Sequence, residues 1–333
     1  MKIICSKSSL LKSVSIALKA VPSKTTMPIL ECILMDATTN QIKFTTNDME
    51  LGIETIVDGI IEEKGMVALD AKIFYEIIRR LPDNDVTIKT DDKYAATITC
   101  EKAKFNIPGK SGEDFAYLPL IEKDEPLTIS QYTLKEMIRQ TIFSIAVNEN
   151  NKLMTGELFE IKENCLKVVS LDGHRIAIRK MPLKKEYSDR KVVVPGKTLS
   201  EVSKILSGEV DDQVSIYFTK NHILFEFDQT MVVSRLIEGE YFRIDQMLSS
   251  DYETKLKINK KEFLDCIDRA TLLVREVDKK PIIINITDDD MELRIDSAMG
   301  SMNEEIDIEK EGKDIMIGFN PKFLIDALRV IDD

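Results

Sequence analysis

The segment of this chain most suggestive of chemistry is Asp172-Gly173-His174-Arg175, where an acid and an imidazole stand two residues apart. Such a pair can act in general acid–base catalysis when a further group supplies a nucleophile. No such partner is evident in the sequence, and the glycine is equally typical of a tight turn between two strands. A turn is the simpler interpretation, and an enzyme built on this segment is kept as an alternative.

Other patterns that would indicate an enzyme or a metalloprotein are missing from the sequence. It has two histidines, His174 and His222, and no glycine-rich phosphate loop or nucleophile elbow. We therefore predict no catalytic residue, no metal and no cofactor. The five cysteines are an odd number without a Cys-x-x-Cys pair, which predicts free and mostly buried thiols. With apolar runs too short to span a bilayer and no secretory signal, the chain is expected to be cytoplasmic.

Basic residues recur at two positions that repeat every 125 residues. The two sets are Lys72, Lys197 and Lys322, and Arg79, Lys204 and Arg329. Within each segment the two positions are seven apart and share one face of a helix, with Glu76, Glu201 or Asp326 between them. One interpretation is a local ladder of ion pairs four residues apart on a solvated helix. The other is a mildly positive surface that faces a polyanion and contacts phosphates without reading sequence.

The elements that carry these positions form an internal repeat. A strand running directly into a helix occurs at 3–20, 127–144 and 256–276, and a second such unit follows each at 67–80, 192–207 and 315–330. Ser6, Ser130 and Asn259 stand where side-chain oxygens cap helices, and Asn320-Pro321 is a strong helix start. Alternating runs between the helices, such as 41–45 and 164–169, predict antiparallel strands.

The repeat predicts an α+β fold of three similar domains, each with two helix-plus-antiparallel-strand half-units. We expect their boundaries at residues 1–124, 125–252 and 253–333. The first two copies continue past their second helix into further strands, whereas the sequence ends at Asp333 in the third. The third domain is therefore expected to be C-terminally incomplete by roughly 35–45 residues.

Charge is divided unequally between helices and the rest of the chain. The formal net charge is −12, yet the six predicted helices carry +8 and the remainder −20. A net charge of −12 spread evenly over the surface would argue against nucleic-acid binding, but a basic face formed by the helices is compatible with it. No aromatic residues alternate with these basic positions, so stacking on single-stranded bases is not indicated.

Several segments resemble the bacterial DNA polymerase III beta subunit, the sliding-clamp family, over the entire chain. They are Met27-Pro28-Ile29-Leu30, Thr46-Asn47-Asp48-Met49-Glu50-Leu51, the segment from Leu171 to Ala177, Val194-Pro195-Gly196-Lys197-Thr198-Leu199, and Ser234-Arg235-Leu236-Ile237-Glu238-Gly239-Glu240-Tyr241. The resemblance implies a non-catalytic processivity factor, a head-to-tail homodimer whose helices line a ring around duplex DNA with the sheets outside. A ring held by topology needs only weak phosphate contacts, because strong ones would oppose sliding.

The resemblance and the basic helices together name candidate site residues. The expected DNA contacts are Lys12, Lys24, Lys72, Arg79, Arg80, Lys152, Lys197 and Lys204. The family's partner-peptide groove, between the second and third domains, would use Met154, Leu171, Gly173, His174, Arg175, Ile176, Phe242, Met247 and Phe323. Met154, Met247 and Phe323 could instead be plain core, and Phe242 replaces the family's usual proline. The ring would close through Phe105 and Ile107 against Leu272 and Leu273.

The same resemblance implies the partners: double-stranded DNA, the replicative polymerase, the clamp loader and repair proteins that bind through short peptides, in a nucleoid-associated cytoplasmic complex. A protein-interaction scaffold of the same fold that never encircles DNA is the remaining alternative.

Overall fold

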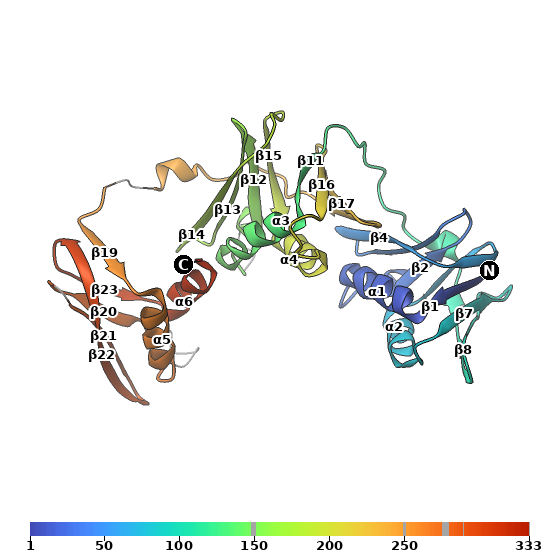
Figure 1. The fold of residues 1–333 in the computed structure, drawn as a ribbon, viewed down its shortest axis with the longest axis horizontal. Coiled ribbons are helices and arrows are strands. Elements are labelled where there is room, and N and C mark those ends of the chain that lie inside the picture. The colour runs from blue at the N-terminus through green and yellow to red at the C-terminus, as the bar shows by residue number, and fades with distance from the viewer. Residues whose placement is uncertain (148–150, 249–250, 275–279, 289, 333) are drawn as a thin grey trace.

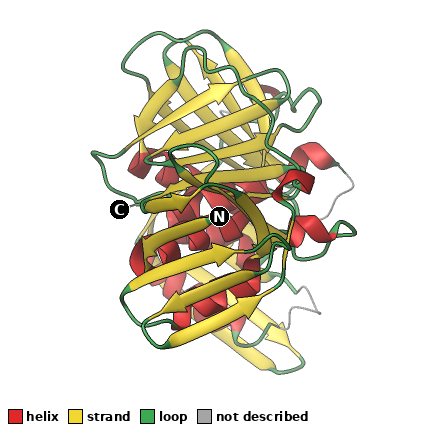
Figure 2. Cartoon of the chain, turned by 90° about the vertical axis from the view of Figure 1, so that its right-hand side faces the viewer, coloured by secondary structure: helices red, strands yellow, loops and turns green. Residues whose placement is uncertain are grey.

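The computed structural model describes residues 1–147, 151–248, 251–274, 280–288 and 290–332. Three groups of helices and sheets follow one another along an arch, with the helices toward its concave side and the sheets toward its convex side (Figure 1). Seen from the first group, the strands lie across the front and the helices lie behind them (Figure 2).

Two α-helices belong to each group. In chain order they are α1 (Lys7–Ala17), α2 (Ala71–Arg80), α3 (Gln131–Arg139), α4 (Gly196–Ile205), α5 (Lys260–Thr271) and α6 (Pro321–Val330). The predicted caps are confirmed: the side chains of Ser6, Ser130 and Asn259 each accept a hydrogen bond from the backbone N–H three residues on. The first and third helices end earlier than predicted, because the chain tightens into the 3₁₀ turns η1 (Leu18–Ala20) and η4 (Ile142–Ser144).

The strands pair antiparallel throughout the described residues. The first group contains β1 (Lys2–Ser6), β2 (Cys32–Asp36), β3 (Ile42–Asn47), β4 (Leu51–Val57), β5 (Ile60–Glu63), β6 (Met66–Asp70), β7 (Asp85–Thr90), β8 (Ala96–Cys100), β9 (Ala103–Ile107) and β10 (Gly109–Lys110). The second contains β11 (Leu127–Ser130), β12 (Gly156–Lys162), β13 (Cys165–Leu171), β14 (Ile176–Pro182), β15 (Arg190–Pro195), β16 (Gln213–Phe218), β17 (His222–Phe227) and β18 (Thr230–Arg235). The third contains β19 (Thr254–Ile258), β20 (Ile282–Ile286), β21 (Asp290–Ser297), β22 (Gly300–Gly312) and β23 (Ile315–Phe319).

One sheet joins the first two groups. Its nine strands run in the order β10-β6-β2-β3-β4-β18-β17-β16-β11, so β4 of the first group pairs directly with β18 of the second. The other sheets, β5-β1-β7-β8-β9, β14-β13-β12-β15 and β19-β22-β21-β20-β23, each stay within one group. In the described part of the chain no strand pairing links the second group to the third.

Each group has its own apolar core between helices and sheet. The repeat register is visible there, since Phe74 and Leu199, 125 residues apart, are both fully buried in the cores of the first two groups, and Leu324 packs against the third. Cys165 is partly exposed and the other four cysteines are buried, and all five are free, as predicted. This arrangement confirms the predicted fold class of three similar helix-and-sheet domains.

Candidate partner and nucleic-acid surfaces

The turn between β13 and β14 is built by Asp172. Its Oδ1 accepts hydrogen bonds from the backbone N–H groups of His174 (3.0 Å) and Arg175 (3.2 Å), and Gly173 takes a positive φ of 87°. The other oxygen, Oδ2, accepts from Arg175 Nε at 2.9 Å. The His174 ring stacks instead on Phe323, with ring centroids 5.7 Å apart. The carboxylate is thus used to form the turn and to pair with arginine, and this geometry favours the turn over an acid–imidazole dyad.

Arg175 connects the second group of elements to helix α6. Its Nη1 donates to Asp326 Oδ2 at 2.8 Å, and its Nη2 donates to the Phe143 carbonyl at 2.6 Å. The guanidinium also lies 4.5 Å from the centroid of the Phe323 ring and 5.3 Å from that of Phe143. The side chain is only 16% exposed, so these partners define its position. Asp172, Asp326 and Phe143 were not among the predicted site residues.

An apolar cluster adjoins this turn. Leu171 is buried in it together with Tyr241 and Ile244, and the predicted residues Met154, Ile176 and Phe242 pack against it. We call the surface formed by the turn residues Gly173, His174 and Arg175, by Phe323 and by this cluster the joint site.

Two residues of the predicted groove, Gly173 and Met247, are not packed against this apolar cluster. An ideal Cβ built on Gly173 would have no atom within 4 Å, so open space lies beside the turn. Met247 follows the 3₁₀ turn η6 (Ile244–Gln246) and is 53% exposed, outside the buried cluster. Met154 and Phe323 are half-buried, so of the three residues with a plain-core alternative Met247 fits that interpretation least.

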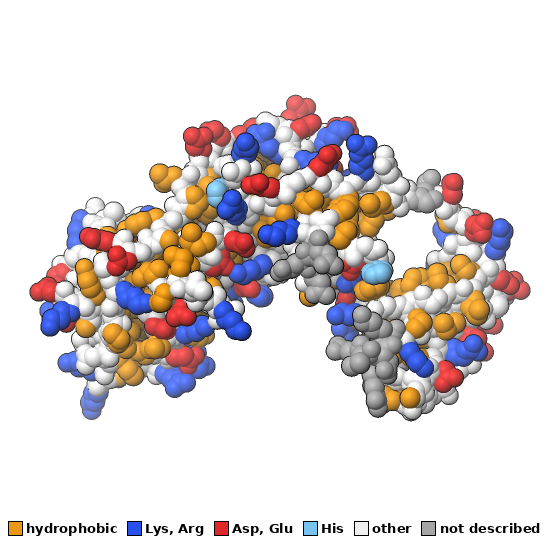
Figure 3. Space-filling model, turned by 180° about the vertical axis from the view of Figure 1, so that it is seen from behind, with side chains coloured by type: hydrophobic (Ala, Val, Ile, Leu, Met, Phe, Trp, Pro, Cys, Tyr) orange, Lys and Arg blue, Asp and Glu red, His pale blue; other side chains and the backbone are white. Residues whose placement is uncertain are grey.

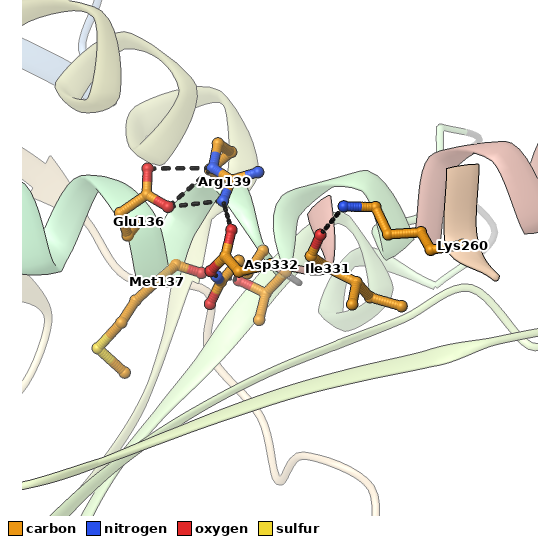
Figure 4. A network of polar contacts seen from close by, with 8 residues as sticks. Glu136, Met137, Arg139, Lys260, Ile331 and Asp332 are labelled. Carbon is orange, nitrogen blue, oxygen red and sulfur yellow. Dashed lines mark hydrogen bonds and ion pairs between the residues drawn. The ribbon is translucent and has the colours of Figure 1, made fainter. Parts of the chain in front are cut away.

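A second set of polar contacts connects the same two groups on the helix side (Figure 4). Arg139 on α3 pairs with Glu136 at 2.6 Å and with Asp332 at 3.1 Å, and Gln140 donates to Asp332 at 2.8 Å. Lys260 donates to the Ile331 carbonyl at 2.6 Å. The Lys260 bond lies within the third group, so side-chain contacts rather than paired strands link the second and third groups in the described residues.

The joint between the first two groups contains an equivalent turn. Asp48 follows β3 as Asp172 follows β13, accepts from the N–H groups of Glu50 and Leu51, and precedes a residue of positive φ, Met49 (77°). Here the carboxylate pairs with Lys197 of α4.

In two helices, the predicted ion pair between a lysine and the acid four residues later is wrong. Lys197 pairs across the joint with Asp48 rather than with Glu201, and Asp326 pairs across the other joint with Arg175. Pairs three residues apart form toward the C-terminus of two helices, Glu76 with Arg79 at 2.8 Å and Glu201 with Lys204 at 2.8 Å, whereas Arg329 pairs with Asp268. At the joints between groups, ion pairs with residues distant in sequence replace the pairs expected within the helix.

The expected DNA contacts are all exposed. Those on helices lie on the concave side of the arch with α1, α2 and α4, while Lys24 stands in the loop after η1, and Lys152 begins the 3₁₀ turn η5 (Lys152–Thr155). Figure 3 shows basic side chains along the inner edge of the arch, and acidic and basic ones mixed on its outer side. The arch encloses a hollow between the first and third groups (Figure 3).

The residues expected to close a ring lie at opposite ends of the arch. Phe105 is on β9, an edge strand, and is 39% exposed, and Leu272 at the end of α5 is 75% exposed. Ile107 and Leu273 are half-buried and pack against the cores of their own groups. The two exposed residues are therefore the ones available to a second copy.

The described residues lack the features of a metal site and of a membrane-spanning helix. They contain no cluster of three or more His, Cys, Asp or Glu side chains arranged to hold a metal ion. Among them, no helix is long and apolar enough to cross a membrane.

Comparison with protein families matches every group of elements. The N-terminal domain of the DNA polymerase III beta subunit matches residues 1–119, its central domain residues 128–242 and its C-terminal domain residues 245–333. The last match lends no support to the expectation that the third domain lacks strands.

Individual relatives agree with this assignment. The beta sliding clamp of Staphylococcus aureus is 37% identical over 326 residues, which are 95% of this chain and 86% of the relative. A putative DNA polymerase III beta subunit from Eubacterium rectale superposes with a TM-score of 0.98 at 71% identity, over 100% of this chain and 90% of that one. The Bacillus subtilis sliding clamp gives 0.96 at 34% identity with the same coverage.

A more distant structure supplies a ligand. The Pseudomonas aeruginosa sliding clamp, 22% identical with a TM-score of 0.93 over 100% of this chain and 90% of that one, was solved with griselimycin bound. On the evidence of its three matched domains and its relatives, the chain belongs to the DNA polymerase III beta subunit family, the sliding clamps that serve DNA polymerase as non-catalytic processivity factors.

Proposed function

We propose that two copies of this chain close head to tail into a ring that encircles duplex DNA and slides along it without reading sequence. The observation that supports this most directly is the placement of the repeated helix pairs on the concave side of the arch, with basic residues of α1, α2 and α4 exposed there (Figure 1). The three clamp domains would span residues 1–124, 125–252 and 253–333. The ring would act where replication occurs, in the cytoplasm and at the nucleoid.

The charges on the concave side suit a ring that binds DNA phosphates only weakly and can therefore slide. Glu76 and Glu201 each neutralise basic neighbours that would otherwise contact phosphates at full charge. Affinity for DNA through phosphate contacts falls steeply with salt, and each further contact steepens that dependence. A diluted positive lining, including Lys12, Lys24 and Lys152, therefore favours sliding over stationary binding.

Ring closure would join β9 of one copy to the third domain of the other. The edge of β9 is unpaired, and Phe105 would meet Leu272 of the second copy, with Ile107 and Leu273 completing the contact. Apolar side chains that are exposed in one copy would be removed from water on both sides.

The joint site would receive short peptides from the replicative polymerase, the clamp loader and repair proteins. Its part-buried apolar residues would contact aliphatic or aromatic side chains, and the exposed turn at Gly173 and His174 offers backbone and imidazole groups at the rim. Met247 would form part of the outer wall.

A topological experiment tests the proposal. The protein is loaded by a clamp loader onto a nicked circular plasmid, or onto the same plasmid cut once, and the DNA-bound fraction is separated by gel filtration. A sliding ring runs off the open ends, so we expect retention on the circle and loss from the linear form. Blocking both ends with bound streptavidin should restore retention.

The same experiment distinguishes the alternative scaffold that never encircles DNA. Such a scaffold would be retained equally on circular and open linear DNA, or on neither, and end-blocking would change nothing. Raising the salt concentration after loading provides a further control, because retention by topology depends far less on salt than retention by phosphate contacts.

A further inference from the structure

A carboxyl group is buried beneath the joint site. Glu157, the second residue of β12, has no solvent exposure, and burial raises its pKa from 4.5 to about 8. The hydroxyl of Thr141 lies 3.1 Å from both of its carboxyl oxygens. That hydroxyl also lies 2.7 Å from the Met137 carbonyl, which can accept its single proton.

Because the Thr141 hydroxyl has one proton and two competing acceptors, the geometry favours a proton on Glu157. If Thr141 donates to Met137, a charged Glu157 is left without a donor in a fully buried position, which is costly. A neutral Glu157 instead donates its own O–H to Thr141 Oγ1, and each proton then has one acceptor.

The turn that contains Thr141 also holds Arg175. The Thr141 carbonyl accepts from the Ser144 N–H at 3.0 Å and from Ser170 Oγ at 2.5 Å. Between them, Phe143 presents its carbonyl and its ring to Arg175. The path from the buried carboxyl to the guanidinium therefore has three contacts: Glu157 with Thr141, Thr141 with Ser144, and Phe143 with Arg175.

Ionisation of Glu157 would disturb the turn through the Thr141 hydroxyl. A carboxylate would compete with the Met137 carbonyl for the single Thr141 proton. Ser144 Oγ, on the same turn, is buried without a hydrogen-bond partner in the described structure.

The other ionisable groups around Glu157 do not compensate its charge. The Tyr241 phenol faces it, and burial together with Glu157 raises the pKa of that phenol, so it stays neutral. Arg175 lies across the turn and is committed to Asp172 and Asp326. The charged groups of the adjoining helices have other partners: Lys135 donates to the Leu206 carbonyl, and the remaining groups form the pairs Arg139–Glu136, Lys197–Asp48 and Lys204–Glu201.

We propose that neutral Glu157 is a positioning residue of the joint site: it holds the turn from Thr141 to Ser144, and thereby Arg175, so that partner binding weakens when Glu157 ionises. This inference rests on the proposed peptide-binding role of the joint site. The stabilising effect of the neutral form is complete below pH 4.5 and is lost as pH rises toward about 8, because the folded state raises the pKa.

The test compares the unsubstituted protein with Glu157→Gln between pH 6.5 and 9. Glutamine keeps the shape and a donor but cannot ionise. With fluorescent griselimycin as the probe, we expect the unsubstituted protein to lose at least about fivefold in affinity over this range, and the variant less than about twofold. Parallel profiles would overturn the proposal.

A matched control is Glu160→Gln, on the same strand but part-exposed beside Lys167, which should leave the pH profile of the unsubstituted protein unchanged. A second readout needs no partner: the ¹⁵Nε–H resonance of Arg175 should titrate near pH 8 in the unsubstituted protein and not in Glu157→Gln. Absence of that titration would refute the positioning role even if the probe binds. Failure of the probe to bind at any pH would count against the proposed function of the joint site instead.

Discussion

A Leu272→Asp chain is expected to be monomeric at micromolar concentrations at which we expect the unsubstituted chain to be a dimer. Leu272 is 75% exposed in the single copy, so the substitution should leave the fold intact. In the closed ring it would bury an unpaired carboxylate against Phe105 of the second copy, at a cost of about 3 kcal/mol, or roughly a hundredfold in dissociation constant. Light scattering coupled to gel filtration gives the mass directly.

Leu120→Asp supplies the matched control. Leu120 lies in the loop before β11, near the end of the first domain, and is fully exposed, so the same change of residue should leave the dimer intact. A dimeric Leu272→Asp, or a monomeric unsubstituted protein, would contradict ring closure through this contact. The monomeric variant should also lack the retention on circular DNA that we expect of the unsubstituted protein.

Arg175→Ala is expected to loosen the third domain relative to the second. The substitution leaves Asp172 and Asp326 without their cation in a largely buried position, which costs about 3 kcal/mol. The aromatic contacts with Phe323 and Phe143 are lost with it. Double electron–electron resonance between spin labels in the second and third domains should show a broader distance distribution.

Two comparisons make that result specific. A label pair across the first and second domains should be unaffected, because β4 and β18 remain paired. Arg179→Ala removes an exposed arginine from the same strand as Ile176 and should leave both distributions unchanged. Equal broadening in Arg175→Ala and Arg179→Ala would show that the Arg175 contacts do not hold the joint.

Local features of the fold were predictable because they depend on neighbours in sequence. Ser6, Ser130 and Asn259 cap helices through oxygens that reach backbone N–H groups three residues on, and the helix at Asn320-Pro321 begins where predicted. The interval of 125 residues placed equivalent helices correctly, since each repeat buries the same side of the same elements.

The contacts between domains were not predictable from these rules. Helical spacing favours Lys197 with Glu201 and Lys322 with Asp326, yet Lys197 and Asp326 both pair across joints. Pairing of β4 with β18, and the turn carrying Phe143 beside Arg175, join residues that are far apart in sequence. Most joint-site residues were named through the resemblance, whereas Glu157 carries no sequence signal, because a glutamate in a strand is ordinarily taken to face water.

The nine-stranded sheet has a mechanical consequence. A continuous ladder of backbone hydrogen bonds across β4 and β18 resists bending far more than a few side-chain pairs do, so the first two domains form one stiff arm. In the described residues, the third domain is attached without strand pairing, through the ion pairs Arg175–Asp326 and Arg139–Asp332, the stacking of His174 on Phe323 and single hydrogen bonds. When a closed ring is strained, most of the bending should therefore occur between the second and third domains of each subunit. This junction is also where partners would bind.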